Sequence, residues 1–199
     1  MKYAITISRE FGCGAREIAR KVASDMGITL YDKDLIDETA RKAGVHVDLI
    51  KDSDEKAGRF MKEFSYGSAT TFYSEKAIAA QAEVIREAAD RESCVLFGRC
   101  ADYILREYNN CIHIFLYAPL EYRIQHISEE YGLDMKSAEK MIKKIDRQRH
   151  NYYKYVTGKN RGARDGKNLM IDVGFYGIDG TVELIDKAVR QKFNLPEMS

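Results

Sequence analysis

The sequence predicts one α/β domain in which a five-stranded parallel sheet carries helices on both faces. Three observations lead to this fold class. Short apolar runs alternate with longer segments of helical periodicity, which is typical of β-α-β units. The apolar runs lack an in–out alternation, as expected of parallel strands buried on both sides. The length of 199 residues suits one domain, so residues 1–199 are expected to form a single unit.

The N-terminal elements follow a strand–loop–helix–strand order. Residues 3–7 are apolar and partly β-branched, which favours a buried strand. A loop with two glycines, residues 8–14, separates this strand from a helix predicted at 15–26. Gly27 ends that helix, and residues 28–31 form the second strand.

The next part of the chain has a weaker pattern. Two short helices are expected around residues 33–43 and 46–50, and the polar stretch 51–62 is expected to be exposed. A longer helix is predicted at 74–91.

The remaining strands are predicted at residues 94–97, 112–117 and 169–172. Pro119 suits the first turn of a helix, and two helices rich in basic residues are expected between about 120 and 155. A polar loop with glycines, a last strand and a terminal helix at 182–192 complete the chain.

Composition excludes several classes of protein. The formal net charge is +1, so no overall field attracts nucleic acid, and anion binding must come from locally clustered charge. No apolar stretch approaches the roughly 20 residues that cross a bilayer, and we expect no leader because the first residues lack a charged-then-apolar pattern. The four cysteines lack paired metal or redox spacing. We expect a cytoplasmic protein with reduced cysteines and no membrane partner; the sequence permits a homo-oligomer.

A shared sheet edge predicts the position of a binding site. In parallel α/β sheets ligands bind beyond the carboxyl ends of the strands. The loop at 8–14, Asp32, Arg99 and the segment after Tyr117 all follow predicted strands, so they are expected along one edge.

The loop at 8–14 is the first candidate within that edge. A strand, a glycine-bearing loop and a helix together aim backbone N–H groups at phosphate, and Gly12 and Gly14 permit the positive φ that such a loop needs. The standard phosphate loop adds a lysine and a hydroxyl after its last glycine. Here Ala15 and Arg16 occupy those positions. An ordinary strand–helix turn is the alternative interpretation.

The missing lysine leaves the source of positive charge open between Arg9 and Arg16. A guanidinium is a fork rather than a point charge, so its contacts with phosphate would differ from those of lysine. Cys13 lies in the loop at a helix N-terminus, where a thiolate would be stabilised. A small space-filling role for Cys13 is the alternative that we favour.

The chain resembles the cytidylate-kinase-like family of P-loop proteins. The resemblance lies in four segments that occur in the family's order. These are I-S-R-E-F-G-C-G-A-R-E-I-A from Ile7 to Ala19 with Ile5–Thr6 before it, Tyr31–Ile36, Gly98–Leu105 and Asp146–Tyr153. It implies a P-loop NTPase-like fold with a helical lid, ATP as donor, Mg²⁺, and a small-molecule nucleotide as acceptor.

The resemblance also implies roles for individual residues. The donor phosphates would be held by Arg9, Gly12, Cys13, Gly14, Ala15, Arg16 and Glu17. Arg99 would bind the acceptor phosphate, with a structural salt bridge as its alternative role. Asp32 would hold Mg²⁺ through water, with helix N-capping as the alternative. An acceptor-side insert is expected at about 37–75.

The bases between about residues 128 and 165 are expected to form the lid that closes over the donor. Within this lid segment Arg147 and Arg149 are the predicted phosphate clamps; with Arg16 and Arg99 they are the predicted catalytic residues. Most of the other bases are expected to be solvated. Tyrosines interleave with these bases, which also suits nucleic acid, but the balanced net charge argues against that partner.

Three functions follow from these residues. The first is ATP-dependent phosphorylation of a nucleoside monophosphate, with CMP first. The second is nucleotide binding for sensing or regulation without turnover, which the absent lysine favours. The third is a kinase of another small phosphate acceptor. Cytidylate kinases follow the arginine of their G-R-D motif with an aspartate that reads cytosine, whereas Cys100 follows Arg99 here.

Overall fold

The computed structural model describes residues 2–33, 35, 36 and 75–196. The short helix expected at 46–50 and the exposed stretch at 51–62 lie outside these residues, as does nearly all of the expected insert at 37–75. The five strands of the sheet and the helices that pack around it lie within the described residues.

A five-stranded sheet forms the centre of the molecule, as predicted. Its strands are β1 (Ala4–Arg9), β2 (Thr29–Tyr31), β3 (Cys94–Phe97), β4 (Cys111–Tyr117) and β5 (Leu169–Asp172). They are all parallel and lie in the order β2-β3-β1-β4-β5. In the register Ile5 pairs with Val95 on one side and with Ile112 on the other. The central strand β1 therefore delivers its following loop to the middle of the sheet's carboxyl edge.

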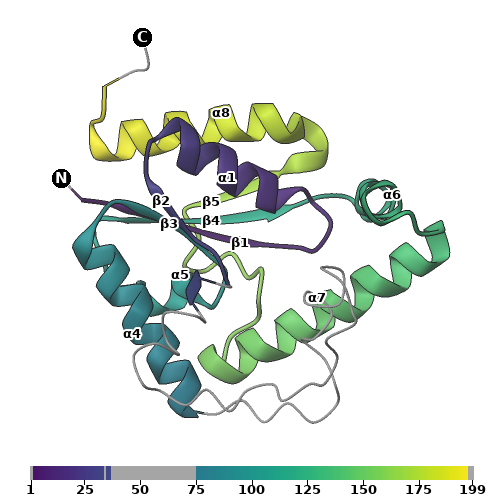
Figure 1. Cartoon of the computed structure of the whole chain (residues 1–199), viewed down its shortest axis with the longest axis horizontal. Helices are drawn as coiled ribbons and strands as arrows, with labels where there is room; N and C mark the ends of the chain where they lie inside the picture. Colours follow the sequence, from purple (N-terminus) through teal and green to yellow (C-terminus); the bar gives the residue numbers. More distant parts are fainter. Residues whose placement is uncertain (1, 34, 37–74, 197–199) are drawn as a thin grey trace.

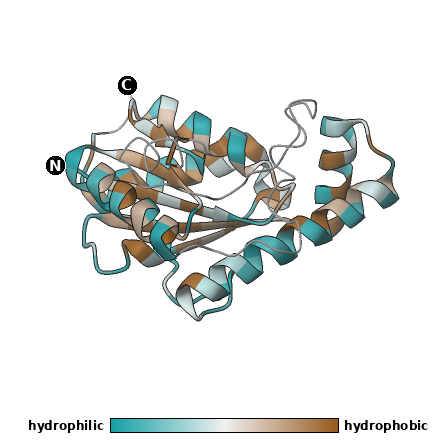
Figure 2. Ribbon diagram, turned by 60° about the horizontal axis from the view of Figure 1, so that its bottom comes forward, coloured by the Kyte–Doolittle hydropathy of each residue, from teal (hydrophilic) through white to brown (hydrophobic). Residues whose placement is uncertain are grey.

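Helices cover both faces of the sheet (Figure 1). They are α1 (Ala15–Asp25), α4 (Glu75–Arg91), α5 (Ala101–Ile104), α6 (Leu120–Tyr131), α7 (Met135–Thr157) and α8 (Val173–Phe193). Helices α1 and α8 pack on one face through a core that includes Ile18 and Ile185, while α4 and α5 pack on the other through Ile85 and Ala101. Hydrophobic colour concentrates in the strands between these layers (Figure 2).

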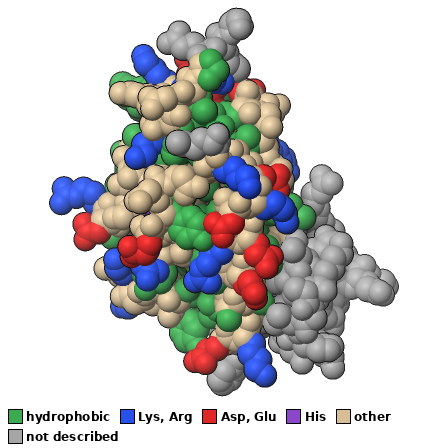
Figure 3. All heavy atoms as spheres, turned by 90° about the vertical axis from the view of Figure 1, so that its left-hand side faces the viewer, with side chains coloured by type: hydrophobic (Ala, Val, Ile, Leu, Met, Phe, Trp, Pro, Cys, Tyr) green, Lys and Arg blue, Asp and Glu red, His purple; other side chains and the backbone are tan. Residues whose placement is uncertain are grey.

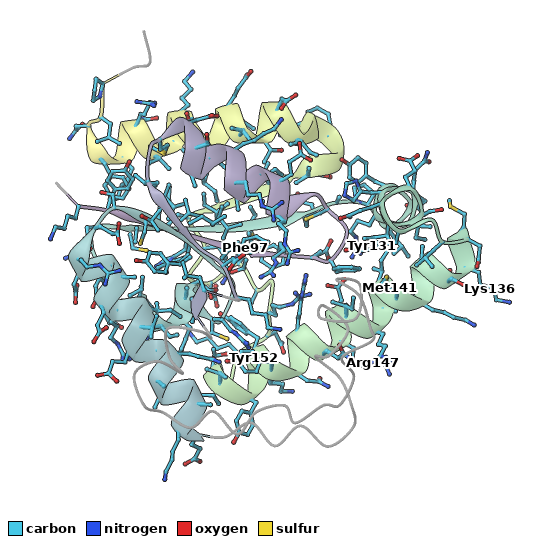
Figure 4. The ribbon with its side chains drawn as sticks, viewed as in Figure 1. Phe97, Tyr131, Lys136, Met141, Arg147 and Tyr152 are labelled. Atoms are coloured by element: carbon cyan, nitrogen blue, oxygen red, sulfur yellow. The ribbon has the colours of Figure 1, made fainter. Side chains whose placement is uncertain are left out.

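Helices α6 and α7 form an arm beside the sheet rather than a layer on it. Ile127 of α6 and Ile142 of α7 belong to a separate buried cluster that also contains Phe11 of the glycine loop. In Figure 4 Tyr131 and Met141 lie together where the two helices meet, and Tyr152 lies at the opposite end of α7. This arm corresponds to most of the lid segment, and it packs directly on the loop.

The terminal helix is longer than predicted. The expectation was a helix at 182–192, but α8 begins directly after β5 and contains a break at Gly177, whose φ of 68° and ψ of 177° are not helical. The Asp172 side chain caps the first turn by accepting from the Gly174 N–H at 2.9 Å. Three glycines between residues 173 and 181 weaken the helical pattern there, so the sequence located only the regular part of the helix.

The surface that faces the viewer in Figure 3 carries basic and acidic side chains intermingled, without a stripe of one sign. Among the described helices, none combines the length and the hydrophobicity that a membrane span requires.

Candidate functional site

The loop after β1 has the backbone geometry of an anion cradle. Gly12 and Gly14 have φ values of 84° and 75°, and Gly14 is the N-cap of α1. Within the described part of the chain, the N–H groups of Gly12 and Gly14 donate no backbone–backbone hydrogen bond. Unpaired N–H groups at a helix N-terminus attract anions because they add to the positive end of the helix dipole. The loop can therefore bind phosphate through its backbone.

The buried side chain of Cys13 contacts the backbone of this loop. Its side chain is 1% exposed, and its Sγ donates to the backbone oxygens of Glu10 at 3.3 Å and Leu116 at 3.7 Å. Burial raises the pKa of the Cys13 thiol to about 11, although the positive charge of Arg149 acts in the opposite direction. These contacts give Cys13 a packing position in the loop.

The protonated state of the thiols gives a testable expectation. Cys13, Cys94, Cys100 and Cys111 are all buried and free, and burial raises the pKa to about 11 for Cys13 and about 12 for the other three. At pH 8 a thiol of pKa 11 is about 0.1% thiolate, against roughly a quarter for an ordinary thiol. We expect native protein to react with Ellman's reagent at least about a hundredfold more slowly than unfolded chain, and faster as pH rises. A thiol that reacts rapidly in native protein at pH 8 would contradict this expectation.

Arg9 lies between the glycine loop and the end of β3. Its guanidinium carbon is 3.9 Å from the centre of the Phe97 ring. A Cβ atom at Gly98 would lie only 2.5 Å from Nη1 of Arg9, so the glycine makes room for this guanidinium. Arg9 thus connects the loop with the Gly98–Cys100 segment that follows β3.

Further arginines converge on the same loop. Burial lowers the pKa of Arg9 well below its ordinary value, and the charges of Arg149 and Arg161 lower it further. Arg16, in the first turn of α1, acts on Arg9 in the same direction. The guanidinium carbon of Arg149 is 5.2 Å from the centre of the Phe11 ring. The loop is therefore surrounded by guanidinium groups from β1, α1, α7 and the segment after α7.

One carboxylate joins the arm to the loop. Asp146 of α7 accepts from the Phe11 N–H at 2.9 Å and from Arg161 Nη2 at 2.7 Å through Oδ1, and from Arg123 Nη1 at 2.7 Å through Oδ2. Arg161 also donates to the Arg9 backbone oxygen at 2.7 Å. Arg123 of α6 donates to the backbone oxygens of Phe11 and Ala118. We call Asp146 with its three donors, Phe11, Arg123 and Arg161, the Asp146 clamp.

A cavity of about 530 Å³ opens beside the loop, under the carboxyl ends of β4 and β5. Aromatic side chains from β4 and charged side chains from α7 share its lining. The lining residues are Glu10, Phe115, Tyr117, Asp146, Arg147, His150, Arg161, Gly162 and Met170. The predicted clamp residue Arg147 therefore lies at the cavity, whereas Arg149 lies at the loop; Figure 4 labels Arg147 near the middle of α7.

Arg99 follows β3 in an unusual backbone conformation. Gly98, Arg99 and Cys100 have φ values of 89°, 53° and 56°. Two successive non-glycine residues in the left-handed region are strained, and such strain is characteristic of functional segments. The Arg99 guanidinium lies over the Tyr152 ring at 5.7 Å, and the Tyr152 hydroxyl donates to Gln81 Oε1 at 2.9 Å. Arg99 thus lies between β3 and the end of α7.

The other two sequence-predicted residues lie farther from these contacts. Asp32 accepts from the Leu35 N–H at 3.1 Å, which is a capping contact, and its strand β2 is separated from β1 by β3. Glu17 is half exposed on α1, with its carboxylate 3.4 Å from the Lys21 ammonium. Among the described residues, no group of three His, Cys, Asp or Glu side chains is arranged to hold a metal ion.

The sequence did not single out Asp146, Arg123 or Arg161, although they make the densest polar contacts at the loop. Asp146 lies within a run of basic residues. A single carboxylate among many cations was the sequence feature that could have identified it as a site residue. Arg161 was one member of that basic run. Nothing local marks Arg123, which is 8% exposed and faces partners on other elements.

Comparison with known proteins gives two findings on sequence. The model of the cytidylate kinase-like family matches residues 4–174. A cytidylate kinase from Methanopyrus kandleri is 25% identical over 112 residues. That alignment covers 52% of this chain and 58% of the relative, so the match spans little more than half of the relative's length.

Solved structures resemble the whole chain. An uncharacterized protein from Eubacterium ventriosum has a TM-score of 0.76 at 29% identity, with 96% of this chain and 99% of that chain covered. A shikimate kinase from Acinetobacter baumannii in complex with shikimate has a TM-score of 0.53 at 15% identity, with 96% and 94% covered. A gluconokinase from Sinorhizobium meliloti has a TM-score of 0.56 at 13% identity, with 98% of each chain covered. The last two show that the fold is that of small-molecule kinases.

Proposed function

Because the chain belongs to the cytidylate kinase-like family, we propose that it transfers the γ-phosphoryl group of ATP to a nucleoside monophosphate, with CMP as the first acceptor. An oxygen of the acceptor phosphate attacks the γ-phosphorus, the bond to the β–γ bridging oxygen breaks, and ADP leaves. Such transfer needs charge and position more than covalent chemistry.

The observation that carries the proposal is a cluster of guanidinium groups around a glycine-bearing loop at a helix N-terminus. Five guanidinium groups contact or surround the loop; among them, Arg123 pairs with Glu10 and Asp146, and Arg161 pairs with Asp146. The five belong to Arg9, Arg16, Arg123, Arg149 and Arg161. A polyphosphate is an anion that several guanidinium groups can bind together, because each group donates charge-assisted hydrogen bonds to phosphate oxygens.

The donor and acceptor would bind on neighbouring parts of the sheet edge. The N–H groups of Gly12, Cys13 and Gly14 and the first turn of α1, with Ala15 and Arg16, would hold the donor phosphates. Arg99 would bind the acceptor phosphate as a bidentate donor. Arg9 lies between the two positions, so it would face the transferred group.

Mg²⁺ would neutralise the phosphates of the donor. Magnesium in kinases is held by one or two carboxylates together with water and phosphate oxygens, so a complete protein cage is not required. Asp32 remains the carboxylate that we propose, acting through water because β3 separates β2 from β1. Glu10 belongs to the loop itself and lines the cavity.

This function is tested by measuring ADP release with one acceptor at a time. Purified protein is incubated with ATP and Mg²⁺, alone and with CMP, dCMP, UMP, AMP or shikimate. We expect ADP release that requires a nucleoside monophosphate and is greatest with CMP. Release that requires shikimate instead would select a kinase of another small acceptor, an alternative that the replacement of aspartate by Cys100 permits.

Binding without turnover is the second candidate function, and a specific residue favours it. Ala15, which is 4% exposed, stands where the standard phosphate loop has lysine. ATP binding in calorimetry without ADP release for any acceptor would select this sensor function. Absence of both binding and release would contradict both functions.

A further inference from the structure

We propose that the cation missing from the phosphate loop is supplied by helix α7: Arg149, which the Asp146 clamp holds beside the loop, binds the donor phosphates in place of a loop lysine. The inference rests on the proposed binding of a nucleoside triphosphate at residues 12–16. It differs from the sequence-based expectation, in which Arg9 or Arg16 supplied this charge.

The loop itself has no site for a flexible ammonium. Ala15 is the first residue of α1 and is buried in the same core cluster as Cys13. The next residue, Arg16, is half-buried in the first helical turn. A polyphosphate bound by N–H groups alone would keep much of its negative charge, so a cation from another element is required for tight binding.

Arg149 is placed at the loop by a contact with Phe11 and by the effect of its charge on two loop residues. Its guanidinium lies over Phe11, 5.2 Å from the ring centre. Among the neighbouring charges, that of Arg149 lowers the pKa values of both Arg9 and Cys13 most strongly, and both residues belong to the loop at 8–14. Arg147, two residues earlier, projects about 200° away around the helix and lines the cavity instead. Only one of the two predicted lid arginines therefore faces the loop.

The Asp146 clamp explains how α7 keeps this arginine in place. Asp146 lies three residues before Arg149, which puts both side chains on one face of the helix. Its carboxylate accepts a loop N–H and two guanidinium groups, all between 2.7 and 2.9 Å. Arg123 and Arg161 are held in turn by backbone oxygens. Asp146 is therefore a positioning residue for Arg149.

The consequence is that donor affinity depends on the docking of α7. A lysine within the loop would act whether or not the arm is docked. An arginine on α7 acts only while the Asp146 clamp joins α7 to Phe11. Binding of the donor and docking of the arm should therefore stabilise each other.

Equilibrium binding of two probes tests the inference. ATP and inorganic tripolyphosphate, which has the phosphates without the base, are titrated into the full chain by calorimetry. We expect Arg149→Ala to weaken both probes by about 10–100-fold, the range for a lost charge-assisted contact. Arg149→Lys, which keeps the charge, should retain most of the affinity. Lys136→Ala removes one exposed charge from the same helix, and Figure 4 shows Lys136 pointing away from the loop; it should change affinity less than about twofold.

A double substitution tests the clamp. Asp146→Asn should weaken tripolyphosphate binding roughly as much as Arg149→Ala. The double variant should bind about as weakly as the weaker single variant, because both substitutions remove the same contact, that of Arg149 with the phosphates. If Asp146→Asn fails to fold, the Arg149 series alone decides. Wild-type protein that binds ATP while Arg149→Ala matches Lys136→Ala would overturn this inference and leave the proposed function standing. Wild-type protein that binds neither probe would overturn both.

Discussion

Replacement of Lys167 by methionine is expected to lower the free energy of unfolding by about 3–5 kcal/mol. The Lys167 ammonium pairs with the Asp102 carboxylate, and the two side chains are 3% and 2% exposed. Asp102 also accepts from the Tyr153 hydroxyl at 3.1 Å, and the ammonium lies 5.5 Å from the centre of that ring. Removal of the ammonium leaves a buried carboxylate without its counter-charge. Unfolding by urea, followed by circular dichroism, measures the loss.

The control for this prediction is a lysine with the same chemistry and little burial. Lys143 is 62% exposed on α7, so Lys143→Met should change stability by less than about 0.5 kcal/mol. The double variant Lys167→Met/Asp102→Leu should recover part of the loss, because an apolar pair removes the need to bury charge. A loss below about 1 kcal/mol for Lys167→Met would show that water or another cation reaches Asp102.

The strands were predictable because buried parallel strands appear in the sequence as short continuous apolar runs. The predictions at 94–97 and 169–172 coincide with β3 and β5, and the other three strands agree within two residues at each end. The positive φ of Gly12 and Gly14 was also predicted, because glycine is the residue that adopts it without strain. Local composition was sufficient to predict these strands and the backbone conformation of these glycines.

Long-range polar pairs were not predictable for a physical reason. Lys167 and Asp102 are 65 residues apart, and Asp146 and Phe11 are 135 apart. No local pattern marks such partners, since their contact depends on where whole elements pack. The same holds for Arg99 and Cys100, whose positive φ values arise from the surrounding structure and not from the intrinsic preference of arginine or cysteine. The sheet edge was therefore foreseeable, whereas the partners of each charged group were not.

Gly12→Ala is expected to reduce both stability and donor binding. At a φ of 84° an alanine is strained by about 1–2 kcal/mol. Its Cβ would also lie 2.9 Å from Cγ1 of Ile127 and 3.2 Å from the backbone oxygen of Arg123. Ile127 is 1% exposed, so it has little room to move, and relief of the clash adds about 1–3 kcal/mol. The total expected loss is about 2–5 kcal/mol, measured by urea unfolding.

Gly27→Ala separates strain from contact in this prediction. Gly27 has a φ of 62°, but a Cβ there would meet nothing within 4 Å, so only the strain of about 1–2 kcal/mol applies. The clash at Gly12 must be relieved by movement of the loop away from α6, which displaces the N–H groups of Gly12, Cys13 and Gly14. We therefore expect Gly12→Ala to weaken tripolyphosphate binding at least about tenfold and Gly27→Ala to leave it unchanged, since each well-placed charge-assisted hydrogen bond contributes about 1.5–3 kcal/mol. If both variants lose the same stability and bind the probe equally well, the tight packing of the loop on α6 has no part in holding phosphate, and the anion would have to bind elsewhere on the sheet edge.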